Sequence, residues 1–312
     1  MRLIRLWPDD SRFDFMRFRR FSFPFSAIIS VATVVLLLTV GLNFGIDFKG
    51  GTLMELQAKS GQADVGKVRE AANGFGFGDV EVQEFGTAGG ISLRFAIQEG
   101  GEAAQSAVVQ KARDTFGGEY EFQRVETVGP RVSGELVQSG TIGIILAVVA
   151  VLFYLWFRFE RELAVGAIIG TLHDIVLTLG FFVITRHEFN MTSIAAILTI
   201  VGYSLNETVV VFDRTRELMR RYKTMPSVEL LNLSINNTMS RTVMTAVTTA
   251  LSLLALVLFG GRAIEGFAQV MLYGVVICTY SAICISSPML IYIGLRGSEA
   301  AKTVGGKVAP AE

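Results

Sequence analysis

The sequence predicts a polytopic α-helical membrane protein, with six transmembrane helices and a small ferredoxin-like α+β domain between the first and the second. Composition is the first observation, because 51% of the 312 residues are hydrophobic and only 18% are charged, against about 25% charged in ordinary soluble proteins. The second is a series of six apolar runs, each near the length of about 20 residues that crosses a bilayer. The third is a polar stretch, residues 45–134, that separates the first run from the other five.

The domain boundaries follow from these runs. The first run could be a cleaved signal peptide, but its apolar core, residues 27–42, is longer than a signal core and no small-residue cleavage site follows it. We therefore expect it to remain as a transmembrane helix. The apolar runs are 21–46, 136–157, 163–185, 189–212, 242–261 and 266–295. The expected parts are a basic N-terminal segment 1–25, transmembrane helix 1 at 26–44, the α+β domain at 45–134, helices 2–6 at 135–295 and a tail 296–312.

Arginine and lysine are distributed unequally between the two sides of the predicted membrane. They gather in residues 2–20, 158–161 and 214–223, whereas the short loops of the opposite side hold only Arg186 and Arg262. Since basic loops stay in the cytoplasm, both termini are predicted to be cytoplasmic. The phenylalanines among the N-terminal arginines could indicate a nucleic-acid patch, but next to a spanning helix they indicate interfacial anchoring.

The polar stretch reads as β, α, β, β, α, β, the order of a ferredoxin-like unit. The expected strands and helices are 52–57, 63–72, 80–85, 91–97, 102–116 and 120–128, with a glycine-rich turn at 86–90. No histidine or cysteine lies in this stretch, and its glycines suit turns better than phosphate loops. A binding or contact role is therefore expected there, rather than catalysis.

Few residues of the chain suit a metal or a disulfide. The two cysteines, Cys278 and Cys284, lie in one apolar run, and the two histidines, His173 and His187, stand apart from any ligand spacing. We expect no metal, no cofactor and no enzyme activity.

Ionisable residues inside the predicted spans need a reason, because each costs about 2.5–3.5 kcal/mol at mid-bilayer. Asp174 lies near the middle of the third run, in line with Gly166, Gly170 and Thr178. Small residues at this spacing let helices approach closely, so Asp174 is expected to face a neighbouring helix rather than lipid. His173 lies beside it, about 100° around the helix.

The fourth and fifth runs bring further polar groups into the cytoplasmic half of the membrane. Asn206 and Glu207 lie in the fourth, and Arg241 opens the fifth, followed by a polar stripe that begins at Thr245. One interpretation is static, with Glu207 paired to Arg241 and Asp174 bonded to Asn206. The other is a proton path, in which protonation and pairing with Arg241 compete for Glu207, because burial disfavours a charged carboxylate.

Four motifs make the chain resemble the SecF family, the smaller subunits of bacterial SecDF translocases and relatives of the resistance–nodulation–division transporters. They are GIDFKGGT at 45–52, His173-Asp174, GYSLNET at 202–208 with FDR at 212–214, and Ser240-Arg241-Thr242. The first and third are long and specific. The order of spans also agrees, so the resemblance covers nearly the whole chain.

The signature at 45–52 also has a meaning of its own. Gly45, Gly50 and Gly51 permit tight backbone where a helix ends and a strand begins, and Asp47 and Lys49 lie at the outer interface, where charge costs little. We expect it mainly to end the first helix and to open the external domain.

The resemblance implies a role in protein export. It implies a multi-pass subunit of the bacterial inner membrane that works with SecD beside the SecYEG channel. There it would use the proton-motive force to promote preprotein translocation after the ATP-driven step of SecA, with YajC and YidC as further partners. It also implies that Glu207 and Arg241 take part in proton relay, with Glu207 at a position where many members have Asp. His173, Asp174 and Asn206 are expected to support this relay.

Two other functions are compatible with parts of the sequence. One is a proton-driven small-molecule exporter of the same superfamily, although such exporters have twelve spans and two larger loops. The other is an intramembrane hydrolase using His173, Asp174 and Glu207, although the chain lacks an HExxH pair. The six spans therefore favour half of a pseudo-symmetric bundle that needs a partner.

Overall fold

The structure is a computed structural model that describes residues 8, 11–84 and 89–295, with the side chains of 262 and 263 also outside the description. Arg2, Arg5, most of the glycine-rich turn and the 296–312 tail fall outside the described residues. The chain divides into two compact units. A helical unit comprises residues 1–43, 144–187 and 192–312, and a sheet-containing unit comprises 44–143 and 188–191.

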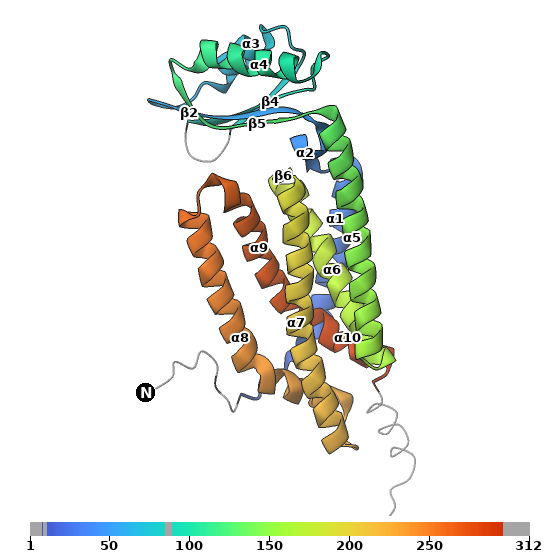
Figure 1. The fold of residues 1–312 in the computed structure, drawn as a ribbon. Coiled ribbons are helices and arrows are strands. Elements are labelled where there is room, and N and C mark those ends of the chain that lie inside the picture. The colour runs from blue at the N-terminus through green and yellow to red at the C-terminus, as the bar shows by residue number, and fades with distance from the viewer. Residues whose placement is uncertain (1–7, 9–10, 85–88, 296–312) are drawn as a thin grey trace, which may run out of the picture. The chain divides into compact units, whose positions relative to one another are not determined.

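Within the described residues, six helical segments are long and apolar enough to cross a membrane, as predicted. The first is α1 after the short 3-10 turn η1, and the last is α9 continued by η2 and α10 (Figure 1). The bounds are η1 Phe15–Phe18, α1 Arg19–Thr39, α5 Pro130–Arg158, α6 Arg161–Thr185, α7 Met191–Arg221, α8 Ser227–Phe259, α9 Arg262–Ser281, η2 Ala282–Ser286 and α10 Ser287–Ile293.

Three of the spans form the interior of the helical unit. About half of the most apolar window is buried in α6 (50%), α7 (50%) and α9–α10 (56%), against 17% in α1 and 11% in α5 and α8. The bulky residues of the outer helices stay exposed, as lipid-facing residues do, because hydrocarbon is as good a solvent for them as a protein core.

Small residues on α6 allow it to approach the last span closely. A Cβ atom on Gly170 would collide with the hydroxyl of Ser286, and one on Gly166 would meet Leu290. The π-helical turn η2 lies between α9 and α10, and close contact between α6 and this turn places Asp174 in the interior. The predicted row of small residues is thus a face that permits close helix approach.

One helix begins well before the apolar run that predicted it. α8 starts at Ser227 rather than near Thr242. Its first turns are amphipathic, so a hydropathy window excludes them, but they bury Leu231 and Ile235 completely in the core around Phe212. Amphipathic burial against neighbouring helices makes this stretch helical.

The second unit contains a four-stranded antiparallel sheet in the order β3-β4-β2-β5. The observed order of elements, strand–helix–strand–strand–helix–strand, is the one the sequence predicted. The bounds are β2 Gly51–Ala58, α3 Val65–Asn73, β3 Val80–Glu84, β4 Gly90–Phe95, α4 Gly101–Phe116 and β5 Tyr120–Val128.

Period-two alternation separates the two faces of this sheet. Met54, Leu56 and Leu93 are fully buried on the face covered by α3 and α4 (Figure 1), where Val108 of α4 completes the core. The opposite face carries charge: Arg124 of β5 lies 3.6 Å from Glu55 of β2 and 2.7 Å from Glu126 on its own strand.

Candidate functional site

Glu207 is a buried carboxylate in the middle of the helical unit. It lies on α7 with only 2% of its surface exposed. The hydroxyl of Thr245, on α8, donates a hydrogen bond of 3.0 Å to Glu207 Oε1. Arg241 acts on this carboxyl at longer range, and the buried hydroxyls of Tyr203 and Thr242 have no hydrogen-bond partner among the described residues. Helices α7 and α8 therefore build the site together, since α7 supplies the acid and α8 supplies its hydroxyl partner and the nearby cation.

The hydroxyl of Thr245 has one hydrogen and three acceptors within reach. Besides Glu207 Oε1, the carbonyl oxygens of Arg241 and Thr242 lie 3.1 and 3.0 Å from Thr245 Oγ1. An ionised Glu207 can only accept, so it takes the Thr245 hydrogen. A protonated Glu207 can donate to Thr245, whose hydrogen then turns back to a helix carbonyl. The bond can thus reverse direction without movement of either helix.

Arg241 does not form a static bridge with Glu207. Its side chain is exposed, and among the described residues no ion pair within 4.0 Å joins it to Glu207, so the two groups attract one another only at longer range. The static interpretation of this pair is therefore wrong for this structure. The Glu207 carboxylate is held instead by a neutral hydroxyl, which leaves the guanidinium free to move.

Asp174 is the centre of a second, fully buried polar group. None of its surface is exposed, and the hydroxyl of Ser204 on α7 donates to Asp174 Oδ2. His173 Nδ1 lies 3.3 Å from the other carboxylate oxygen, and its Nε2 is buried without a hydrogen-bond partner. As predicted, Asp174 faces a neighbouring helix rather than lipid.

The partner of Asp174 is not the one that the static interpretation named. Asn206 is exposed on α7, and Ser204 takes the place expected for it. The reason is the rotation of α7 about its axis. Ser204 and Glu207 are three residues apart and lie on the buried side of the helix. Asn206 is one residue from Glu207, which places it about 100° around the helix and away from that side.

The signature at 45–52 holds the start of α7. Asp47, in the short helix α2 (Ile46–Lys49), accepts a hydrogen bond of 2.8 Å from the backbone N–H of Met191, the first residue of α7. The carboxylate thus satisfies an orphan donor and lies favourably at the positive end of the helix. α1 already ends at Thr39, six residues before Gly45, so the expectation that this segment ends the first helix is wrong, and the segment caps α7 instead.

The glycines of the signature are required by geometry. Gly50 and Gly51 have φ values of 70° and 111°, and a Cβ atom on Gly51 would collide with the carbonyl oxygen of Phe95. Gly45 leaves room for Glu188, since a Cβ there would lie 2.7 Å from Glu188 Oε1. Lys49 makes only a surface contact of 3.7 Å with Glu81.

Sequence reasoning missed the contact of Ser204 with Asp174, and also the capping role of Asp47. Ser204 precedes Glu207 by three residues, so helical periodicity could have placed it on the same buried side. Asp47 had no such signal, because its partner Met191 is remote in sequence. In the part of the chain that the structure describes, no group of three or more His, Cys, Asp or Glu residues could hold a metal ion.

Two family models match the chain. The region 108–296 matches the family described as "Protein export membrane protein SecD/SecF, C-terminal", and residues 35–62 match the "SecD/SecF GG Motif". The first match contains Asp174, Glu207 and Arg241, and the second contains the 45–52 signature.

Curated relatives cover nearly the whole chain. The protein translocase subunit SecF of Rickettsia bellii (strain OSU 85-389) is 40% identical over 289 residues, which are 92% of this chain and 95% of that protein. The protein translocase subunit SecDF of Brucella abortus is 40% identical over 298 residues, which are 96% of this chain but 39% of that longer protein.

Solved structures agree with this result. The crystal structure of SecDF, a translocon-associated membrane protein from Thermus thermophilus, superposes with a TM-score of 0.82 at 31% identity over 92% of this chain and 39% of that chain. SecDF in its super-membrane-facing form gives a TM-score of 0.64 at 30% identity, over 96% of this chain and 41% of that one. The chain thus spans well under half of these two SecDF chains.

Proposed function

This chain belongs to the SecF family of protein translocase subunits, and we propose that with SecD it uses the proton-motive force to promote preprotein translocation through SecYEG. The names of its relatives as translocase subunits point to a non-catalytic role and favour export of proteins over export of small molecules. Its place is the bacterial inner membrane, as a multi-pass protein. The arginine-rich loops favour an orientation with both termini in the cytoplasm.

The observation that carries the proton proposal is the environment of Glu207. A carboxyl group that is almost completely buried, bonded to a hydroxyl that can reverse its bond, and near a cation that is not paired with it has two accessible states. In one, Glu207 is ionised and attracts Arg241. In the other, Glu207 is protonated, and Arg241 is released to another acceptor.

Movement of protons through such a site supplies work. One elementary charge that crosses a membrane potential of 100 mV releases about 2.3 kcal/mol. Because Arg241 opens the spanning part of α8 and Glu207 lies on α7, a change in their attraction alters the force between these two helices. The hydrogen bond between Asp47 and Met191 lies within the sheet-containing unit, and α7 runs on from Met191 into the helical unit, so a shift along α7 can reach the external domain through the helix itself. The β3-β4-β2-β5 order favours a ferredoxin-like fold for the domain of residues 45–134. A periplasmic location is favoured by the few basic residues, Arg186 and Arg262, in the short loops on its side of the membrane.

SecD is the proposed partner for the uncovered polar faces of α7 and α8. Gly202 and Asn206 on α7, and Arg241, Thr248 and Ser252 on α8, are exposed in this chain. Polar groups in lipid-facing positions are costly, so these faces require a protein or aqueous neighbour. The Brucella abortus relative is a single, longer chain that is named SecDF. YajC and YidC remain further proposed partners.

A substitution of Glu207 tests the proposal. Proteoliposomes that contain SecYEG, SecA, SecD and the chain would be assayed for preprotein translocation with and without an ionophore. Glu207→Gln keeps the size and the hydrogen-bonding capacity of the side chain but cannot exchange a proton. We expect it to abolish the ionophore-sensitive part of translocation and to leave the ATP-driven part intact.

The matched control is Glu229→Gln, which removes an exposed carboxylate in the first turn of α8. This control should retain the full ionophore-sensitive part. If Glu207→Gln translocates as well as the unmodified chain does under a proton gradient, Glu207 is not a relay group.

A further inference from the structure

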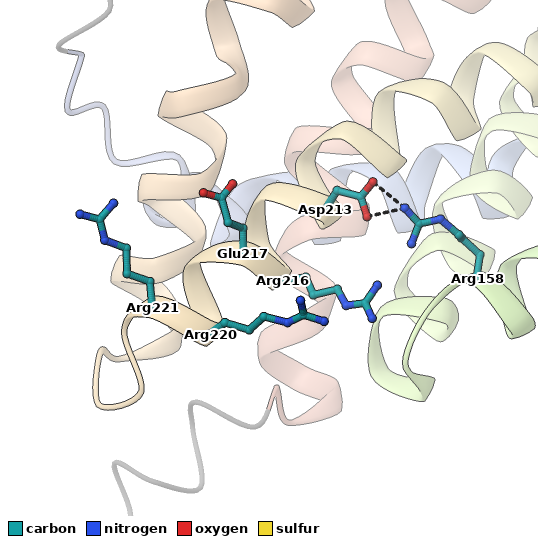
Figure 2. Close-up of a pocket in the computed structure, with 6 residues that line it drawn as sticks. All are labelled: Arg158, Asp213, Arg216, Glu217, Arg220 and Arg221. Atoms are coloured by element: carbon teal, nitrogen blue, oxygen red, sulfur yellow. Dashed lines mark hydrogen bonds and ion pairs between the residues drawn. The ribbon is translucent and has the colours of Figure 1, made fainter.

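Six charged side chains line a pocket at the end of α7, far from Glu207 along the helix. The pocket has a volume of about 470 Å³ and is lined by Arg158, Asp213, Arg216, Glu217, Arg220 and Arg221 (Figure 2). Four arginines and two carboxylates leave a formal charge of +2. All but one of these residues come from α7, and Arg158 is the last residue of α5.

The two carboxylates of the pocket are already engaged. Arg158 donates two hydrogen bonds, of 2.8 and 2.7 Å, to the two oxygens of Asp213, as the dashed lines in Figure 2 show. Glu217 accepts from Arg214, one turn before it on the same helix. The negative charge of the pocket is therefore used, and it does not neutralise the remaining arginines.

Arg216 and Arg220 have no carboxylate within ion-pair distance in the described part of the chain. The Nε atom of Arg216 is buried and makes no hydrogen bond, although a buried guanidinium N–H normally has an acceptor. Both guanidinium groups line the same pocket, and Figure 2 shows them extending to the same side of α7. Two like charges that share a concave site, with an orphaned donor, require an anion.

The position of the pocket relative to the membrane indicates which class of anion it binds. α7 has 31 residues, so it is about 46 Å long at about 1.5 Å per residue, whereas hydrocarbon is about 30 Å thick. The charged end of α7, from Asp213 onwards, follows the apolar part of this helix and so lies at the level of the lipid headgroups. The neighbouring end of α5 exposes aromatic residues to lipid, with Trp156 53% and Phe157 72% exposed, as is usual at that level.

We propose that this pocket binds the phosphate of an anionic phospholipid, with Arg216 and Arg220 as its ligands. A phosphodiester offers two oxygens to the two guanidinium forks, and its acyl chains can lie along the exposed apolar face of α5. The proposal does not depend on proton transfer at Glu207. The positive-inside rule alone would explain these arginines by the orientation of the chain in the membrane. The proposal gives them a second role, as ligands of a lipid phosphate.

Native mass spectrometry of the full chain in mild detergent tests this proposal. The protein would be titrated with phosphatidylglycerol and, separately, with phosphatidylcholine. We expect one phosphatidylglycerol to be retained in preference to phosphatidylcholine. The pair Arg216→Gln and Arg220→Gln should weaken this retention by roughly tenfold for each arginine removed, because each substitution removes a charged hydrogen bond to the phosphate.

The control pair is Arg161→Gln, at the first residue of α6, and Lys223→Gln, in the loop after α7. It removes the same charge from exposed positions outside the pocket. It should change retention less than about twofold, since diffuse attraction is screened and unspecific. Should the glutamine pair fail to fold, Arg216→Lys and Arg220→Lys keep the charge but lose the planar forks. This lysine pair should bind phosphatidylglycerol a few-fold less tightly than the unmodified chain.

Three results would overturn the proposal. One is equal retention of phosphatidylglycerol by the unmodified chain and the glutamine pair, or by the unmodified chain and the lysine pair. Another is an equal loss in the control pair, which would mean general attraction to the membrane surface. The third is binding of glycerol phosphate without any preference for phosphatidylglycerol, which would make the site one for a soluble phosphate.

Discussion

At the scale of single residues, the site depends on which groups face a carboxylate after burial has removed water from it. Glu207 and Asp174 are both buried in the helical unit, and each accepts a hydrogen bond from a hydroxyl on another helix: Thr245 and Ser204, respectively. A hydroxyl can serve as donor or acceptor, whereas an arginine can only donate. This chemistry suits a carboxyl group that changes its protonation state.

Substitution of Thr245 separates its hydroxyl from its shape. Thr245→Val removes the donor to Glu207 but keeps the volume, and hydrogen bonds to charged groups contribute about 1.5–3 kcal/mol. We expect the ionophore-sensitive part of translocation to fall roughly tenfold, since about 1.4 kcal/mol corresponds to a factor of ten. Thr245→Ser retains the hydroxyl and should stay within about twofold of the unmodified chain. Equal activity of the valine and serine variants would show that the hydroxyl has no part in the relay.

At the scale of elements, the 45–52 signature shows how one short segment determines the geometry around it. Its Asp47 caps the first turn of α7. Its glycines allow the backbone to enter β2, which pairs with β4. Gly51 has a positive φ value and lies against the backbone of Phe95, so two independent requirements exclude a side chain there.

Paired glycine substitutions distinguish these two requirements. Gly61 also has a positive φ value, 76°, but nothing lies within 4 Å of a Cβ atom there. Gly61→Ala should cost about 1–2 kcal/mol, as left-handed backbone does for a residue with a side chain. Gly51→Ala should cost about 1–3 kcal/mol more, because its Cβ overlaps a carbonyl oxygen. Thermal unfolding of the detergent-solubilised full chain, followed by circular dichroism, measures the difference. Equal melting temperatures for the two variants would contradict the predicted overlap.

At the scale of the whole molecule, the helical unit is incomplete on one side. Among α6, α7 and α8, the spans that carry the ionisable residues of the site, α8 is the least buried. Its exposed Thr248 and Ser252 lie in one polar stripe with Arg241. From Phe21 to Leu38 on α1 and from Ile142 to Phe157 on α5, the exposed residues are apolar or aromatic, as is suitable for lipid. The contrast between these faces predicts where the proposed partner SecD binds.

Cysteine cross-linking in membranes tests this assignment. In a background with Cys278 and Cys284 replaced by alanine, Asn206→Cys and Thr248→Cys should each form a cross-link with SecD. Leu38→Cys, at an α1 position that is 83% exposed, should give none, because its face is expected to meet lipid. Capture of SecD at Leu38 but not at Asn206 would place the partner on the opposite side of the bundle.

The parts of the fold that depend on local sequence were predicted well. Hydropathy located all six spans, because whether a segment crosses the membrane depends on its own run of about 20 apolar residues and not on distant parts of the chain. Alternation and turn residues predicted the strands of the second unit, and β5 begins and ends where expected, at Tyr120 and Val128. The start of α8 at Ser227 was missed, since those turns are stabilised by packing rather than by lipid.

What the sequence by itself determined is therefore the membrane character of the chain, its six spans and the list of polar residues inside them. Only the tertiary structure decided which of these residues meet: Asp174 with Ser204 rather than Asn206, Glu207 with Thr245 rather than Arg241, and Asp47 with Met191. The physical reason is rotation. Rotation of a helix about its own axis changes the neighbours of every side chain but not its depth in the membrane. Successive residues lie about 100° apart around that axis, so the rotation decides which of them face another helix. Contacts between helices distant in sequence determine this rotation.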